Sequence, residues 1–174
     1  DGLEVATVSV NLSPNSFHNI ELPRQIADTL QRHALQPADL NLEITQDVLR
    51  SGNPNSLKTL HAVQAMDIGL TVDDFGTGYS CLGYLRHLPV RALKLDRSFV
   101  RDLEHDEITR ALTEAAMRIG DSLRIAVFAE GVENEEQRRL LTHRGYQVAQ
   151  GFLLSRPLSA AQLAAWLRER QPAE

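Results

Sequence analysis

Cysteine is scarce in this sequence, with one among 174 residues, and the six histidines form no cluster. A single cysteine, Cys81, excludes an internal disulfide and a zinc cluster built on several cysteines, and it fits a reducing compartment. The histidines fall in expected helices or loops and share no metal-ligand spacing. Neither residue type therefore marks a metal site or a nucleophile.

Long apolar runs and an excess of positive charge are also lacking. No apolar stretch approaches the roughly 18 residues of a membrane span, and no signal-peptide pattern opens the chain. The formal net charge of -5 argues against general attraction to nucleic acid, which depends on clustered lysine and arginine. We therefore expect a soluble chain with no membrane span and no nucleic-acid polymer as a partner.

Strand-type and helix-type patterns are present, and they alternate about six times along the chain. The spacing from strand to strand is that of βα units, which predicts a parallel sheet. The expected strands cover 5–10, 40–45, 70–72, 92–96, 124–129 and 146–151.

Helix-type spacing between these strands predicts which apolar side chains face the sheet. Helices are expected over 23–34, 79–87 and 134–145. Three further helices are expected from the spacing of their apolar residues. These inward residues are Leu57, Leu60, Val63 and Met66 in one helix, Ile108, Leu112, Ala115 and Ile119 in another, and Leu163, Trp166 and Leu167 in the last.

The fold class expected from this order is α/β, a (β/α)8 TIM-type barrel. A complete barrel has eight strands and at least about 200 residues. With about six βα units, the chain is either an open sheet or an incomplete barrel that forms part of a longer domain.

Two adjacent carboxylates, Asp73 and Asp74, end the apolar strand at 70–72, and a turn with Gly76 and Gly78 follows. Neighbouring side chains on a strand point to opposite faces, so both acids reach one site only where the strand ends and the chain turns. The plain alternative is that they cap the next helix.

Polar residues also follow the other strands, which changes the balance between these interpretations. Active sites of barrels lie at the carboxyl ends of the strands. Carboxylates together with an amide oxygen suit Mg²⁺ or Mn²⁺, and two ions can support phosphoester hydrolysis. Each residue alone also has an ordinary structural explanation. The residues at or near strand ends are Asn11, Glu43, Asp73, Asp74, Lys94, Asp96, Glu130 and Gln150.

Several of these stretches closely resemble motifs of the EAL family of cyclic di-GMP phosphodiesterases. The resemblance spans nearly the whole chain, and the motif with the aspartate pair is its most specific part. The matching stretches lie at 10–13, 42–45, 73–80, 93–96, 129–133 and 150–152.

The resemblance implies a (β/α) barrel that binds two Mg²⁺ or Mn²⁺ ions and opens the cyclic dinucleotide to a linear one. By position, Asn11 and Glu43 are similar to ligands of one ion, and Asp73 to the bridging ligand. Asp74 and Glu130 are similar to ligands of the other ion.

The remaining site residues resemble supporting groups of the family. Lys94 is similar to the lysine that contacts the catalytic water, while Asp96 and Gln150 resemble supporting residues, with Gln150 on the substrate side. Glu133 resembles the acid that holds part of the barrel mouth in place.

Two departures from the family pattern stand out. The Glu-Ala-Leu stretch that names the family, with its metal-binding glutamate, does not occur in this sequence. Gln46 stands where the family has a glutamate that helps to hold the loop bearing the aspartate pair. The departures favour a part of a longer barrel domain, at 1–170 with a frayed tail at 171–174, and they predict weak or no hydrolysis by this chain alone.

Three functions remain open from the sequence. The first is a metal-dependent cyclic di-GMP phosphodiesterase, and the second is a degenerate module that binds the dinucleotide without cleaving it. The third is a Mg²⁺-dependent lyase of the enolase type with Lys94 as the base, although no second base faces Lys94. Gln46 and the missing glutamate favour the second. For the parent protein, the first is favoured over the second by six intact residues, Asn11, Glu43, Asp73, Asp74, Lys94 and Glu130.

The resemblance also implies partners and a location. We expect cyclic di-GMP as the ligand, an upstream sensory or GGDEF domain in the parent protein, and a homodimer, since open sheet edges favour self-association. The expected location is the cytoplasm, with membrane anchoring of the parent through another region.

Overall fold

The fold is built on a parallel sheet, seen in a computed structural model that describes residues 5, 7–50, 53–77, 85 and 90–170. Its six strands lie side by side in sequence order, and every pair is parallel. The strands are β1 (Val8–Leu12), β2 (Leu40–Thr45), β3 (Gly69–Phe75), β4 (Ala92–Leu95), β5 (Ala126–Glu130) and β6 (Val148–Gln150).

Helices occupy the connections that follow β1, β2, β4 and β5, as the alternation predicts. The described helices are α1 (Pro14–Phe17), α2 (Leu22–Arg32), the 3-10 turn η1 (Pro37–Asp39), α3 (Gln46–Arg50), α4 (Pro54–Ala65), α6 (Arg97–Arg101), α7 (Glu107–Leu123), α8 (Glu135–His143) and α9 (Ala160–Arg168). The helix expected at 79–87 and the tail at 171–174 lie outside the described residues.

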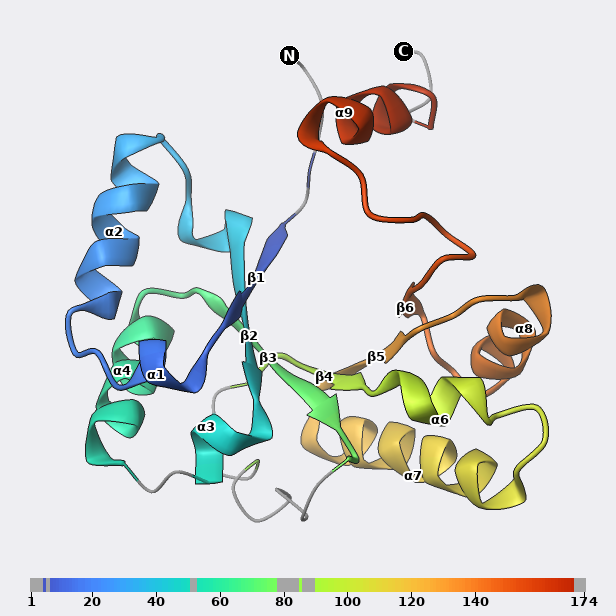
Figure 1. Cartoon of the computed structure of the whole chain (residues 1–174). Helices are drawn as coiled ribbons and strands as arrows, with labels where there is room; N and C mark the ends of the chain where they lie inside the picture. The colour runs from blue at the N-terminus through green and yellow to red at the C-terminus, as the bar shows by residue number, and fades with distance from the viewer. Residues whose placement is uncertain (1–4, 6, 51–52, 78–84, 86–89, 171–174) are drawn as a thin grey trace.

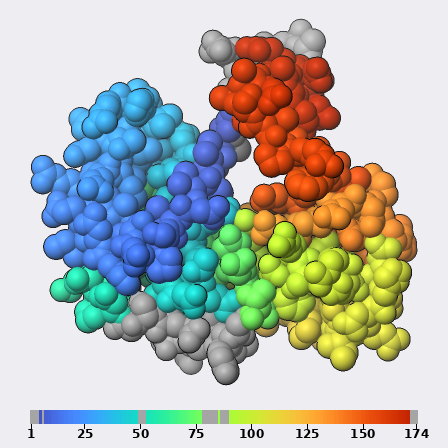
Figure 2. All heavy atoms as spheres, viewed as in Figure 1, coloured from blue at the N-terminus to red at the C-terminus, as the bar shows by residue number. Residues whose placement is uncertain are grey.

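The sheet curls into a half-barrel (Figure 1). Helices α1–α4 lie beyond β1–β3, helices α6–α8 lie beyond β4–β6, and α9 lies above the opening between β1 and β6. The space-filling view shows an open gap between β1 and the segment that leads to α9 (Figure 2). This arrangement confirms an α/β fold in which six parallel strands with helices form an incomplete barrel.

The two faces of the sheet differ in chemistry because strand side chains alternate with a period of two. Apolar side chains such as Leu42, Leu70 and Leu93 are buried in the hydrophobic core. The residues between them, such as Glu43 and Lys94, point to the opposite face, which we call the inner face. The helices therefore cover an apolar face and leave a polar inner face.

The buried face of α7 differs from the expected one. Ile108 is 71% exposed and Leu112 is 48% exposed, although both were expected to face the sheet. The residues that are buried instead are Thr109, Thr113, Ala116 and Gly120.

Close packing explains this choice of face. A Cβ atom at Gly120 would lie 2.4 Å from Cγ2 of Val127, so the helix approaches β5 more closely than a larger side chain allows. Small and β-branched residues therefore face the sheet, and apolar periodicity alone misassigns this helix.

Other differences from the expected elements are smaller. Strand β1 begins three residues later than expected, and β6 is shorter. Strand β3 does not stop before the aspartate pair but continues through it to Phe75. Leu57 of α4 is 47% exposed rather than buried. None of the helices that the structure describes is both long and apolar enough to cross a bilayer.

Candidate active site

The register of the sheet places the expected site residues on the inner face. Asn11 pairs with Glu43, and Glu43 pairs with Thr71, which is two residues before Asp73 on the same face. Glu130 pairs with Gln150 on the last two strands. Side chains two residues apart on a strand share a face, so the expected carboxylates and Gln150 line one surface.

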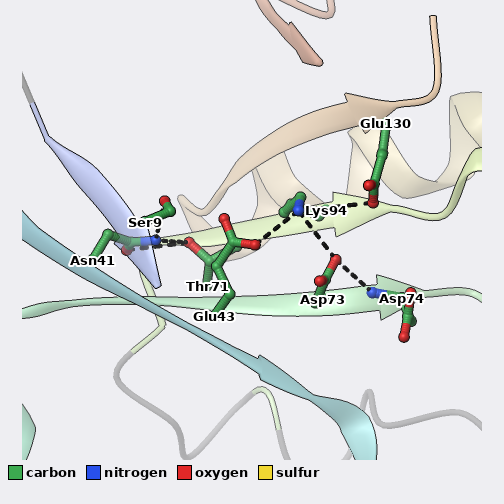
Figure 3. Close-up of polar contacts among 8 residues, drawn as sticks. All are labelled: Ser9, Asn41, Glu43, Thr71, Asp73, Asp74, Lys94 and Glu130. Carbon is green, nitrogen blue, oxygen red and sulfur yellow. Dashed lines mark hydrogen bonds and ion pairs between the residues drawn. The ribbon is translucent and has the colours of Figure 1, made fainter. Parts of the chain in front are cut away.

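Lys94 lies at the centre of this surface (Figure 3). Its Nζ donates a hydrogen bond to Glu43 Oε2 at 2.8 Å, and it lies 3.5 Å from Asp73 Oδ1 and 3.7 Å from Glu130 Oε2. The lysine is 5% exposed and Glu43 is 9% exposed. Acids from three different strands thus converge on one buried ammonium group.

The cluster carries an excess of negative charge. Burial acts to lower the pKa of Lys94, but its hydrogen bond with Glu43 and the charges of Asp73, Glu43 and Glu130 outweigh burial, so that the pKa is raised. Burial raises the pKa of Glu130, and the nearby acids Asp73, Asp74 and Glu43 add to this rise against the opposing charge of Lys94. One ammonium group therefore leaves the acids only partly neutralised.

A turn in the backbone at Asp74 separates the two adjacent acids. Asp74 has a left-handed φ of 55°, and the register between β3 and β4 shifts between Val72 and Phe75. The Asp74 N–H donates to Asp73 Oδ1 at 3.0 Å. Burial raises the pKa of Asp74, and the negative charges of Asp73 and Asp96 raise it further.

The carbonyl of Asp74 is held by hydrogen bonds from two residues. Gln46, the first residue of α3, donates from Nε2 at 2.7 Å, and Thr77 donates from its Oγ1 at 2.9 Å. The Gln46 side chain is 8% exposed. The residue that departs from the family pattern is thus a buried neutral donor to the backbone of the aspartate pair.

Asp96 and Glu133 lie outside the lysine cluster. Asp96 is the N-cap of α6, and its Oδ1 accepts from the Ser98 N–H and hydroxyl. Burial acts to raise the pKa of Asp96, but these hydrogen bonds and the charge of Arg97 lower it overall. Glu133 is exposed, and its N–H donates to Gln137 Oε1 at 2.8 Å.

A cavity of about 560 Å³ lies beside the cluster and connects Glu130, Gln150 and Glu133 with the segment before α9. Its wall includes Arg97 and Arg156, which the sequence argument did not single out. The Arg156 guanidinium lies 4.8 Å from the centre of the Phe152 ring. Both arginines follow strand ends by a few residues, which is the signal that would have found them.

The donor chemistry of the cluster suits a hard divalent cation, because carboxylate oxygens gather where they are not fully neutralised. Among the described residues, no three acid, histidine or cysteine side chains surround one point as ligands of an ion do. Glu43, Asp73 and Glu130 instead turn toward Lys94. The carboxylate oxygens are of the kind that binds a divalent cation, and they lie on the same inner face of the sheet.

Comparison with known proteins settles the family. The sequence pattern of the EAL domain matches residues 2–157. The chain belongs to the EAL domain family. The motif stretches noted in the sequence and the half-barrel geometry agree with this membership.

Two relatives show how much of a longer protein this EAL chain matches. It is 42% identical over 158 residues to the bifunctional diguanylate cyclase/cyclic di-GMP phosphodiesterase MucR of Pseudomonas aeruginosa, covering 91% of this chain and 23% of MucR. It is 35% identical over 167 residues to the cyclic di-GMP phosphodiesterase NbdA of the same organism, covering 96% of this chain and 21% of NbdA. The chain thus spans less than a quarter of these relatives.

Solved structures of EAL proteins have the same fold as this chain. The phosphodiesterase PaMucR in complex with c-di-GMP has a TM-score of 0.85 and 42% identity, over 90% of this chain and 64% of that chain. Klebsiella pneumoniae BlrP1, in a manganese and cy-diGMP complex, has a TM-score of 0.81 and 32% identity, over 87% of this chain and 39% of that chain.

Proposed function

We propose that this EAL chain is the greater part of a domain that hydrolyses cyclic di-GMP to the linear dinucleotide with two Mg²⁺ or Mn²⁺ ions. The observation that carries the proposal is the convergence of Glu43, Asp73 and Glu130 on Lys94 at the carboxyl ends of neighbouring strands. The c-di-GMP complex of the similar PaMucR supports the substrate, and the manganese complex of BlrP1 supports divalent metal use.

The residues would divide the ligand set between two ions. Asn11 and Glu43, neighbours in register, would hold one ion, Asp73 would bridge, and Asp74 and Glu130 would hold the other. When bound, such ions lower the pKa of a water and stabilise charge on the phosphoryl oxygens.

Lys94 would act on the reacting water. Its buried ammonium group lies within 3.7 Å of a carboxylate oxygen of each of three proposed ligands, so it would face the charge that develops on the attacking and phosphoryl oxygens. Hydrolysis joins the water oxygen to phosphorus and breaks one P–O ester bond, whose oxygen leaves with a proton.

The remaining site residues would orient the dinucleotide and the loops around it. Gln150 pairs with Glu130 and lines the neighbouring cavity, whose arginines would attract the phosphates. Glu133 would hold the mouth, and Asp96 would fix the start of α6 through its cap.

The proposal extends to the parent protein. A region at 1–170 would form part of a longer barrel domain, coupled to a sensory or GGDEF domain and acting as a cytoplasmic homodimer. The bifunctional relative MucR, whose name includes a diguanylate cyclase, supports the GGDEF partner.

The test is hydrolysis of cyclic di-GMP with Mg²⁺ or Mn²⁺ by this chain and by the longer protein that contains it. We expect turnover by the longer protein and weak or no turnover by this chain. Asp73→Asn in the longer protein should lower turnover by more than roughly 100-fold, beyond the loss typical of outer-shell substitutions. Binding of the dinucleotide without turnover in the longer protein would contradict hydrolysis and support a receptor.

Gln46→Glu gives a second prediction for the longer protein. A glutamate carboxylate cannot donate to the Asp74 carbonyl, so we expect a free energy of unfolding lower by about 1–3 kcal/mol. Turnover is measured beside it, because glutamate is the residue that the family has at this position. Gln46→Met, which removes the donor without adding charge, is the matched control, and its free energy of unfolding should fall by less. An unchanged free energy of unfolding in Gln46→Glu would contradict the role of Gln46 as a neutral donor, while higher turnover would show that Gln46 weakens hydrolysis.

A further inference from the structure

A chain of side-chain hydrogen bonds crosses three strands on the inner face (Figure 3). Asn41 of β2 donates from Nδ2 to Ser9 Oγ of β1 at 3.0 Å and to Thr71 Oγ1 of β3 at 3.0 Å. The Thr71 hydroxyl also lies 3.2 Å from Asn41 Oδ1, to which it can donate in turn. We call Ser9, Asn41 and Thr71 the polar layer.

Each member of the polar layer lies two residues before one candidate ligand on the same strand. Ser9 precedes Asn11, Asn41 precedes Glu43, and Thr71 precedes Asp73. A spacing of two residues keeps side chains on one face of a strand. In the register of the sheet Ser9 pairs with Asn41, whereas Thr71 pairs with Glu43. The polar layer therefore runs diagonally across the strands, two residues before each of the three candidate ligands from β1, β2 and β3.

Polar side chains within neighbouring parallel strands need a specific reason. Strands of a parallel sheet are usually apolar on both faces, and asparagine is disfavoured in strands. Thr71 is 1% exposed, and its hydroxyl is satisfied within the polar layer. Asn41 is half-buried and Ser9 is exposed. The network thus runs from a buried hydroxyl to the open edge of the sheet, and at its buried end the satisfied polar groups specify one arrangement.

Gly69 makes room for this amide. It pairs with Asn41 in the register of β2 and β3, and a Cβ atom at Gly69 would lie 2.6 Å from Asn41 Oδ1. A residue with a side chain at 69 would displace the amide. The sequence therefore accommodates the Asn41 amide from both sides. Ser9 of β1 offers it a hydroxyl, and Gly69 of β3 leaves space for it.

Strand β1 depends most on such a link. It lies at the end of the six-stranded order, so within the sheet that the structure describes it pairs with β2 alone. Backbone pairing fixes its register, while the Ser9–Asn41 bond adds a side-chain constraint one layer below Asn11.

We propose that Asn41 is a positioning residue that sets the height and spacing of Asn11, Glu43 and Asp73 through Ser9 and Thr71. The inference rests on the proposed function, in which these three residues hold divalent ions. Asn41 touches no ligand directly and acts through the strands that carry them.

The test compares Mn²⁺ binding by the wild-type chain, Asn41→Leu, Thr71→Val and Thr71→Ser, titrated by calorimetry, with the denaturant midpoint of each variant. Asn41→Leu removes the amide, Thr71→Val removes one hydroxyl at constant shape, and Thr71→Ser keeps that hydroxyl. We expect Asn41→Leu and Thr71→Val to lose affinity by about tenfold, as for other residues behind a metal site. Thr71→Ser should retain wild-type affinity.

A readout without metal accompanies this titration. The NMR signal of the Asn11 side-chain amide and hydrogen exchange of the β1 backbone should change in Asn41→Leu and Thr71→Val but not in Thr71→Ser. Wild-type affinity, or an unchanged Asn11 signal, in folded Asn41→Leu and Thr71→Val would overturn the role of Asn41. A wild-type chain that binds no Mn²⁺ would count against the proposed function, while the NMR comparison would still decide the positioning role.

Discussion

Replacing Lys94 by methionine should lower the free energy of unfolding by about 3–5 kcal/mol, because removal of one partner from a buried ion pair leaves an uncompensated charge. Here three carboxylates would lose their shared cation. Methionine keeps much of the length of the side chain, so loss of charge dominates over loss of packing. Equilibrium unfolding in urea measures the change, and in the longer protein turnover should fall by about 10²–10³-fold.

An exposed ion pair provides the control for Lys94→Met. Arg138 Nε lies 2.6 Å from Glu135 Oε2, but both side chains are more than half exposed. Arg138→Met should therefore change stability by less than about 1 kcal/mol. Equal losses for the two variants would contradict the importance of burial for the Lys94 cluster.

The difference in stability between wild type and Lys94→Met should also depend on pH. The folded-state pKa of Lys94 is raised above its ordinary value of 10.5, so its stabilisation is present below pH 10.5 and is lost as pH rises through the folded value. The difference in stability between wild type and Lys94→Met should therefore narrow in strongly alkaline solution. A difference that widens there would contradict this sign.

Gly151→Ala should destabilise the end of the sheet that carries Gln150. An added Cβ would lie 2.1 Å from the carbonyl oxygen and 2.3 Å from the nitrogen of Val132, and both are backbone atoms that cannot move alone. Relief of the clash would break the hydrogen bonds from Val132 N to Gln150 O and from Leu153 N to Val132 O. We expect a loss of about 3 kcal/mol, from overpacking together with these hydrogen bonds, measured by urea unfolding.

Gly145→Ala is the matched control for the glycine substitution. Gly145 has a φ of 93°, and an added Cβ would meet only Met117 Cε, at 3.5 Å. The cost should be the left-handed backbone alone, roughly 1–2 kcal/mol. A Gly151→Ala variant as stable as Gly145→Ala would show that the segments after β5 and β6 separate at little cost.

The carboxyl ends of the strands were the most predictable part of the molecule. Apolar runs that stop at Glu130 and Gln150 mark the ends of β5 and β6, whereas β3 continues past Asp73 to Phe75. The parallel order then brings these parts of the strands to one edge. The family motifs at these same positions made the fold and the family predictable as well.

Orientations of side chains and helices were less predictable. Either of two faces of α7 satisfies helical spacing, and close packing of Gly120 against Val127 selected one. The bond from Gln46 to the Asp74 carbonyl joins residues 28 positions apart, so no local pattern indicates it.

The sequence by itself determined the order of strands and helices, the acids at the strand ends and the family, because these depend on local periodicity and short motifs. The tertiary structure decided which acids meet Lys94, how Asp74 turns from Asp73, and that Asn41 links β1 to β3 beneath the site. These contacts depend on register and on the curl of the sheet, which arise only when segments far apart in the chain pack together.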